Sequence, residues 1–175
     1  RVGVTFNRTH YFVDAGTQRG LSFEHLKQFE TLLNTARRTG HLRIHVVFVP
    51  LPRDALLPAL TSGRVDLVAA QLTITPERQA LVDFSNPVRR NVSEVVVTAP
   101  GVPAVKSAED LSGQRVFVRP SSSYADSLRA LNARLEGQGR ALVTIVDAPE
   151  YLDDDDLLEM VNAGLVDMTV VDDYL

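Results

Sequence analysis

The sequence predicts an α/β protein of two lobes, each a mainly parallel sheet flanked by helices. Short β-branched runs alternate with amphipathic helical segments along the whole chain. The alternation occurs twice, and a polar, proline-containing stretch at 84–91 separates the two halves. The 175 residues, of which 45% are apolar, are enough to bury a sizeable core.

The first half, residues 1–90, is predicted to follow the order strand, helix, strand, helix, strand. Phe23, Leu26 and Phe29 recur at helical spacing, which predicts an amphipathic helix. The run at 65–70 is apolar almost throughout, as is typical of a strand buried in a parallel sheet. The predicted strands are 1–6, 43–49 and 65–70, and the predicted helices are 22–38 and 54–62.

The second half, residues 91–175, repeats this pattern. Tyr124, Leu128 and Leu131 share one face of a predicted helix. Three serines at its start, Ser121, Ser122 and Ser123, are candidate capping residues. The predicted strands are 95–98, 115–118, 142–146 and 165–171, and the predicted helices are 121–135 and 153–162.

Composition excludes several classes of function. A net charge of −4 and scattered basic residues argue against a nucleic-acid partner. Apolar runs are of strand length, so no membrane-spanning helix is predicted. Without cysteine the chain has no disulfide, thiolate zinc site or cysteine nucleophile. Its histidines lack metal-site spacing and no G-x-S-x-G or glycine-rich phosphate loop occurs, so we expect no catalytic residue, metal or cofactor.

Four consecutive acids, Asp153–Asp156, open the last predicted helix. Acidic side chains at this place favour the positive end of the helix dipole and cap backbone N–H groups. Calcium binding is the alternative interpretation of the same run. We expect the capping role.

Thr73 and Arg78 follow the carboxyl end of the predicted strand at 65–70. Ligands of open α/β sheets bind at this end of the strands. A guanidinium offers a two-pronged donor to a carboxylate, and the threonine adds a hydroxyl. The alternative is a surface arginine paired with Glu77 or Asp83.

These two residues stand within a set of motifs. The set comprises LPALTSGRVD at 57–66, LTITPER at 72–78 and VDFSNP at 82–87. Together they resemble the signature of type 2 periplasmic binding proteins of the amino-acid type, solute-binding protein family 3. The similarity extends over essentially the whole chain, with further matches in GLSFE at 20–24, DLSG at 110–113 and GLVD at 164–167.

The resemblance implies two lobes, 1–90 and 91–175, that close over a ligand, with a C-terminal return segment to lobe 1 missing after residue 175. In lobe 1, Arg78 and Thr73 would hold the α-carboxylate of the ligand. Gln71 stands where a glycine or serine normally presents backbone groups to the α-ammonium. In lobe 2, Ser121–Ser123 would offer helix N–H groups to an anion, and Asp172 would accept the ammonium.

Two features depart from the family pattern. Arg53 stands near a position where the family often has an aromatic residue, and Thr5 and Phe6 replace the acid that commonly ends the first strand. Arg53 hints at a second anionic group on the ligand. An exposed arginine that merely precedes a helix is the alternative.

The spacing at 20–29 is most similar to the N-terminal module of the membrane-bound lytic transglycosylase F family. This similarity implies a periplasmic, non-catalytic domain for an amino acid or a peptidoglycan-derived peptide, fused to a lysozyme-like domain and regulating it. Membrane contact would come only through parts outside these residues. The alternatives are the solute-binding component of an amino-acid ABC transporter and a dehydratase on the same fold, for which no general acid is identified.

Overall fold

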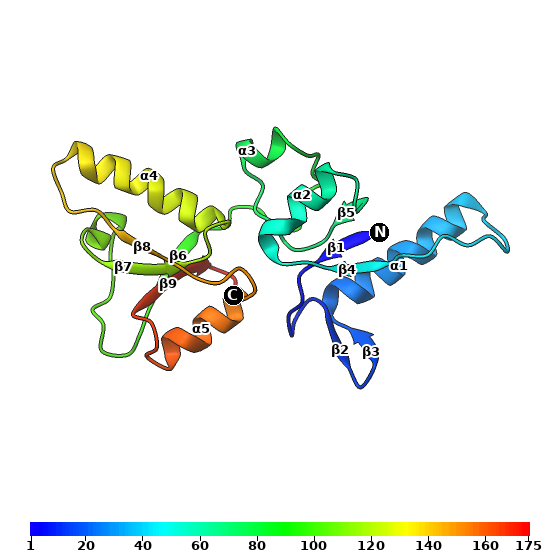
Figure 1. Ribbon diagram of the computed structural model, residues 1–175, viewed down its shortest axis with the longest axis horizontal. Coiled ribbons are helices and arrows are strands. Elements are labelled where there is room, and N and C mark those ends of the chain that lie inside the picture. The colour runs from blue at the N-terminus through cyan, green and yellow to red at the C-terminus, as the bar shows by residue number, and fades with distance from the viewer. The chain divides into compact units, whose positions relative to one another are not determined.

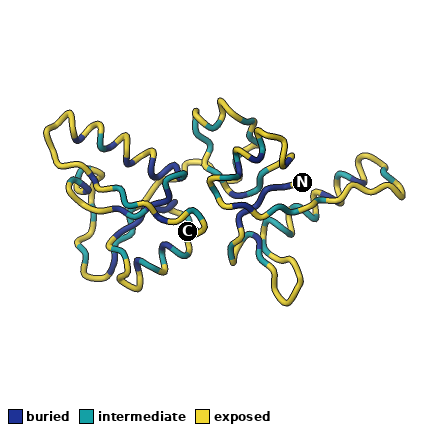
Figure 2. The backbone as a smooth tube through the Cα atoms, viewed as in Figure 1, coloured by how far each residue is buried: buried dark blue, intermediate teal, exposed yellow.

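In the first of two structural units, residues 1–85, three parallel strands form one sheet (Figure 1). The computed structural model describes residues 1–175, and residues 86–175 form the second unit. The strand order is β4 (Phe48–Pro50), β1 (Val2–Val4) and β5 (Leu67–Val68), all parallel. The central strand β1 is buried along its length (Figure 2). The strands are shorter than predicted, but their parallel pairing is the one predicted.

The first unit contains three α-helices and a 3₁₀ turn, namely α1 (Leu21–Arg37), the 3₁₀ turn η1 (Arg53–Ala55) with α2 (Leu56–Thr61), and α3 (Pro76–Gln79). Of these, α1 and α2 pack apolar residues against the sheet. Leu56 of α2 has no exposed surface and packs with Val65 and Ala70. The helices predicted at 22–38 and 54–62 are therefore confirmed to within one or two residues. The short helix α3 was not predicted.

A hairpin that the periodicity does not predict precedes α1. Its strands are β2 (Phe12–Asp14) and β3 (Thr17–Arg19), which pair antiparallel. The two turn residues, Ala15 and Gly16, both have positive φ, 46° and 81°. Positive φ at both central residues matches the twist of the flanking strands. The usual Asn-Gly or Asp-Gly signal of such turns is absent from this sequence, so the hairpin was missed.

The strand predicted at 43–49 is wrong for its first five residues. Residues 43–47 are outside any strand, and β4 begins only at Phe48. Two buried side chains of α1 bind this backbone instead. The Asn34 amide both donates to the Ile44 carbonyl and accepts from the Ile44 N–H, each at 2.8 Å, and the Glu30 carboxylate accepts the Val46 N–H at 2.6 Å. Side chains thus satisfy backbone groups that the prediction assigned to a neighbouring strand.

The contacts of the Glu30 carboxylate predict that the free energy of unfolding of the first unit falls at acid pH. Hydrogen bonds from the Lys27 ammonium, at 2.7 Å, and from the Val46 N–H lower the pKa of Glu30 below its ordinary 4.5, and His45 Nδ1 lies 3.8 Å away. A carboxyl whose folded pKa is depressed stabilises the protein above its unfolded pKa, and this stabilisation is lost as pH falls through the folded value.

The substitution Glu30→Gln is therefore expected to lower the free energy of unfolding by about 1–3 kcal/mol at pH 7. We expect the difference from wild type to shrink as pH falls below 4.5, because the Glu30 carboxyl of the unfolded wild-type chain is protonated there before that of the folded chain. Urea unfolding of both proteins at pH 7, 4 and 3 measures it. A difference that is the same at pH 7 and pH 3 contradicts the assigned role of the charge.

The second unit contains two strand pairs. Strand β7 (Arg115–Val118) pairs parallel with β8 (Thr144–Asp147), whereas β6 (Glu94–Thr98) pairs antiparallel with β9 (Met168–Asp172). The Thr169 hydroxyl of β9 donates to the Phe117 carbonyl of β7 at 2.7 Å. Four strands near the predicted positions are thus present, but one pair is antiparallel.

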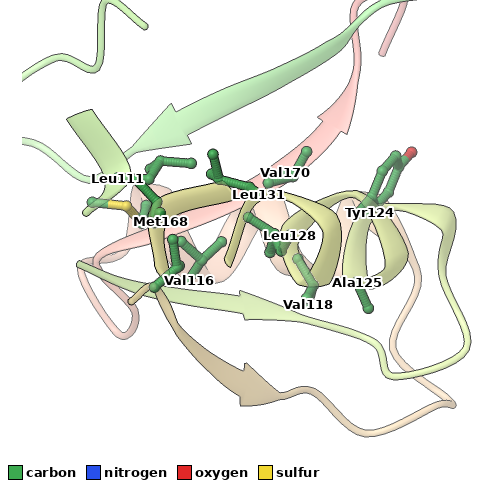
Figure 3. Close-up of a cluster of buried hydrophobic side chains, with 11 residues drawn as sticks. Leu111, Val116, Val118, Tyr124, Ala125, Leu128, Leu131, Met168 and Val170 are labelled. Carbon is green, nitrogen blue, oxygen red and sulfur yellow. The ribbon is translucent and has the colours of Figure 1, made fainter. Parts of the chain in front are cut away.

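The core of the second unit lies between its strands and α4 (Ser123–Gly137) (Figure 3). Leu128 and Leu131 of α4 pack with Val118 of β7 and Val170 of β9 in one buried cluster. The apolar face predicted for this helix is therefore confirmed. The 3₁₀ turn η2 (Ala108–Leu111) contributes Leu111 to the same cluster.

The last helix, α5 (Asp154–Asn162), begins as the acidic run predicts. Asp153 is its N-cap, and Asp156 accepts the Asp153 N–H at 2.9 Å to complete a capping box. The capping interpretation is confirmed. None of the helices is long and apolar enough to cross a membrane.

Candidate functional site

The loop after β5 contains a strained residue at a predicted ligand-binding position. Gln71 has φ +47°, in the left-handed region that favours glycine. The family pattern places a glycine or serine here, and the backbone conformation explains why glycine suits it. Such conformations persist only where the surrounding structure holds them in place, and they are frequent at binding loops. A positive φ at this position is therefore what a glycine of the family pattern would readily adopt.

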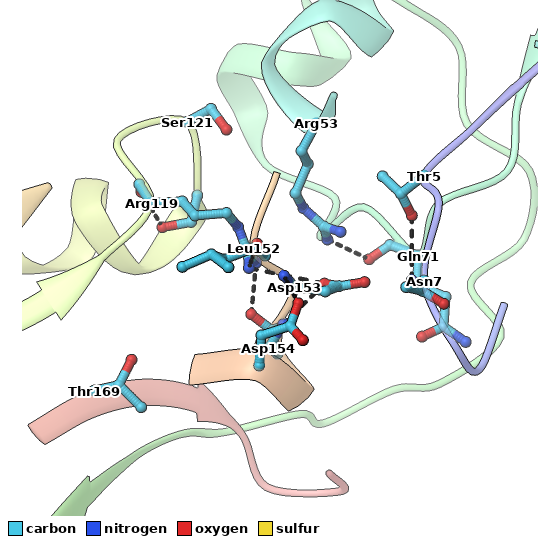
Figure 4. Close-up of polar contacts among 12 residues, drawn as sticks. Thr5, Asn7, Arg53, Gln71, Arg119, Ser121, Leu152, Asp153, Asp154 and Thr169 are labelled. Atoms are coloured by element: carbon cyan, nitrogen blue, oxygen red, sulfur yellow. Dashed lines mark hydrogen bonds and ion pairs between the residues drawn. The ribbon is translucent and has the colours of Figure 1, made fainter. Parts of the chain in front are cut away.

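Arg53 lies beside the same loop. Its Nη2 donates to the Gln71 carbonyl oxygen at 3.4 Å (Figure 4). Because Arg53 opens η1, the turn before α2 and the loop after β5 meet at this point. The structure thus brings two of the predicted site residues together.

Arg78 and Thr73 also meet. The Arg78 Nη1 donates to the Thr73 carbonyl oxygen at 2.8 Å, and Thr75, the N-cap of α3, accepts the Arg78 backbone N–H at 3.3 Å. A guanidinium carries five N–H donors in one plane, and the bond to Thr73 sets the orientation of that plane. The hydroxyl of Thr73 was predicted to act, whereas this contact uses its carbonyl group.

Glu77 is one of the predicted alternative partners of Arg78. Its pKa is lowered, but Arg78 is not the main cause. Backbone hydrogen bonding and the Thr75 hydroxyl lower the pKa of Glu77 most, and the Arg78 charge contributes least. The Thr75 cap therefore accounts for more of the charge stabilisation at Glu77 than a pair with Arg78 does.

The three serines before α4 have different roles. Ser122 is the N-cap: its hydroxyl accepts the Ala125 N–H at 3.2 Å and donates to the Arg119 carbonyl at 2.7 Å. Ser121 binds Glu150 through both its N–H, at 2.9 Å, and its hydroxyl, at 2.6 Å. Ser123 is the first residue of the helix and is buried. The capping prediction is confirmed for Ser122.

Asp172 ends β9 and is only 9% exposed. Its carboxylate accepts a hydrogen bond from the Tyr174 hydroxyl, and the Arg89 guanidinium lies 4.4 Å from the centre of the Tyr174 ring. Glu94 is opposite Asp172 in the strand register. Burial raises the pKa of Glu94 most, and the charges of Asp172 and Asp126 raise it further. Three carboxyl groups, those of Glu94, Asp126 and Asp172, therefore interact at this end of the β6–β9 pair.

Sequence reasoning missed Arg119, which is 1% exposed. Its Nη1 donates to the Leu152 carbonyl at 2.8 Å, and its Nη2 donates to Asp154 Oδ1 at 2.5 Å (Figure 4). Its Nε is buried and has no acceptor. Two features of the sequence could have indicated this ion pair. Arg119 directly follows the apolar run at 116–118, and the four acids at 153–156 are more than one helix cap uses.

The chemistry of these groups is that of binding. The guanidinium groups of Arg53 and Arg78 in the first unit are of the type that binds carboxylates, and the buried Asp172 in the second is of the type that binds cations. No group of three or more His, Asp or Glu side chains in residues 1–175 could hold a metal ion.

Comparison with known proteins identifies the family. Residues 2–174 match the bacterial extracellular solute-binding proteins, family 3. A membrane-bound lytic murein transglycosylase F of Ectopseudomonas mendocina is 34% identical over 165 residues, which are 93% of this chain and 30% of that protein. The L-cystine-binding protein TcyJ of Escherichia coli K12 is 30% identical over 132 residues, 75% of this chain and 46% of the relative. The chain thus spans less than half the length of either.

The same relationship appears in three dimensions. An ancestral arginine-binding protein bound to arginine has a TM-score of 0.74 and 27% identity, covering 99% of this chain and 69% of that one. The fold is therefore the predicted one, that of type 2 periplasmic binding proteins. Because the family match extends over residues 2–174, the chain belongs to family 3 of the bacterial extracellular solute-binding proteins.

Proposed function

We propose that this chain is a non-catalytic, periplasmic binding domain for an amino acid or a peptidoglycan-derived peptide. The observation that carries the proposal is Arg78, whose guanidinium is oriented by the Thr73 carbonyl on the loop after β5. The strained Gln71 lies on the same loop. In this proposal Arg78 binds the α-carboxylate, and Asp172 of the second unit accepts the α-ammonium. Residues 1–90 and 91–175 act as the two lobes.

The substitution Arg78→Ala tests the carboxylate contact. Thermal unfolding of residues 1–175 is measured with L-arginine, L-glutamine, L-cystine and a muropeptide. A ligand that binds only the folded state raises the transition temperature by mass action. Removing Arg78 is expected to weaken binding of that ligand about 100-fold, about 2.7 kcal/mol, because charge-assisted hydrogen bonds are lost.

The matched control is Arg64→Ala, which removes an exposed arginine from the same unit. We expect the Arg64 variant to bind as wild type does. Equal stabilisation of wild type and the Arg78 variant by the same ligand contradicts the role of Arg78. Calorimetric titration of the best ligand with Asp172→Asn then tests the ammonium contact.

We further propose that the domain regulates a peptidoglycan-cleaving enzyme to which it is fused. The similarity to the lytic transglycosylase of E. mendocina, 30% of which this chain covers, supports this role. The second candidate is the solute-binding component of an amino-acid ABC transporter, supported by the similarity to the L-cystine-binding protein. The reading frame beyond codon 175 separates the two, since only the first continues into a lysozyme-like domain.

A further inference from the structure

We propose that Glu150 is an internal carboxylate that occupies the anion-binding position at the start of α4 and thereby excludes ligand carboxylates from it. This inference rests on the proposed function, because it concerns which ligands the second unit accepts. It reverses the expectation for Ser121–Ser123, which were predicted to receive an anionic group of the ligand.

The contact has the geometry of anion recognition. Both carboxylate oxygens of Glu150 are used: Oε1 accepts the Ser121 N–H at 2.9 Å, and Oε2 accepts the Ser121 hydroxyl at 2.6 Å. Ser121 immediately precedes the N-cap Ser122, so the charge lies at the positive end of a 15-residue helix. A ligand carboxylate would seek the same donors at the same place.

Glu150 is held there by its neighbours. The segment that follows it is tied to the end of β7 through Arg119, which binds the Leu152 carbonyl and the Asp154 carboxylate. Four hydrogen bonds therefore link residues 119–121 to residues 150–154. Buried Arg119 thus holds the segment that follows Glu150, and a ligand that displaces the Glu150 carboxylate must replace it on both Ser121 donors.

The consequence is a specificity rule. An anionic group that approaches Ser121 meets a like charge already bound to its donors, and like charges a few ångströms apart repel. A neutral amide or hydroxyl group meets no such repulsion and finds an acceptor in Glu150. The second unit thus favours ligands such as L-glutamine over L-glutamate.

Sulfate titration of the 175-residue chain tests the occupied position directly. Backbone amide NMR is recorded for wild type, Glu150→Ala, Glu150→Gln and the control Glu136→Gln, which removes an exposed charge from α4. Ionic strength is held constant with sodium chloride. We expect sulfate to shift the amides of residues 121–124 in the Glu150→Ala protein with an affinity at least roughly tenfold higher than in wild type. The control should match wild type.

Equal sulfate affinity in wild type and Glu150→Ala overturns the proposal. If the alanine variant does not fold, Glu150→Gln carries the same titration, because it keeps the side-chain size while removing the charge. The Ser121 amide signal should also move in Glu150→Gln and stay in place in Glu136→Gln. An unmoved Ser121 signal in Glu150→Gln likewise contradicts the contact.

Amino-acid binding distinguishes this inference from the proposed function. Calorimetry with L-glutamate and L-glutamine should show a preference for L-glutamine in wild type that falls at least roughly tenfold in Glu150→Ala. If no amino acid binds any variant but sulfate affinity rises, the proposed function fails and the role of Glu150 stands. If an amino acid binds through Arg78 and neither sulfate nor L-glutamate responds to Glu150, the role of Glu150 fails alone.

Discussion

Replacing Arg119 by alanine is expected to lower the free energy of unfolding of the second unit by about 3–5 kcal/mol. Arg119 is 1% exposed, and its guanidinium donates to both Asp154 and the Leu152 carbonyl. Its removal leaves the Asp154 carboxylate, which is 13% exposed, without its buried counter-charge, and it leaves a cavity the size of an arginine side chain. The uncompensated charge and the cavity both lower the free energy of unfolding.

Hydrogen exchange read peptide by peptide measures this loss, because it reports on residues 86–175 separately from the first unit. The control is Arg115→Ala, an exposed arginine on the same strand β7, which should change stability by no more than about 0.5 kcal/mol. The double variant Arg119→Met, Asp154→Asn removes both charges and should recover part of the loss. Equal protection in the Arg119 and Arg115 variants contradicts this account.

Replacing Gly20 by alanine is expected to destabilise the first unit by about 3 kcal/mol or more. Gly20 is the N-cap of α1 with φ 113° and ψ 164°, a conformation that only glycine adopts readily. An added Cβ would lie 2.3 Å from the His10 carbonyl oxygen, a backbone atom that cannot rotate away. That oxygen also accepts the Ser22 N–H at 2.9 Å, so relief of the clash would break the start of the helix.

Gly16→Ala is the matched control in the neighbouring hairpin. Gly16 also has positive φ, 81°, but a Cβ there meets no atom within 4 Å. The Gly16→Ala variant should lose only the free energy that a positive φ costs an alanine, about 1–2 kcal/mol. Urea unfolding followed by circular dichroism, with hydrogen exchange of residues 1–85, compares the two. A Gly20 variant no less stable than the Gly16 variant contradicts the steric argument.

Local patterns predicted the helices well and the strands less well. The apolar spacing of Leu128 and Leu131 and the acidic cap at Asp153 belong to single segments, so α4 and α5 could be located from the sequence. The strand predicted at 43–49 failed because β-branched residues do not show which group will bind their backbone. Here Glu30 and Asn34 of α1 bind it, and no local signal marks them.

In the candidate site, too, the sequence located residues but not their contacts. Family motifs marked Arg78, Thr73 and Gln71, and the structure adds that Gln71 has a left-handed backbone and that Arg78 is oriented by a carbonyl group. The motifs also marked Ser121, but they did not indicate that Glu150 binds it. A pattern of residue types locates donors; it does not show which acceptor reaches them.

The α/β class, the solute-binding family and the main helices could be inferred from the amino-acid sequence alone, because each depends on short-range periodicity or contiguous motifs. The partner of each charged group could be known only from the three-dimensional arrangement. Arg119 and Asp154 are 35 positions apart, and Ser121 and Glu150 are 29 apart. These contacts follow from how the segments after β7 and β8 pack together, because a charged group away from solvent needs a hydrogen-bond partner close in space.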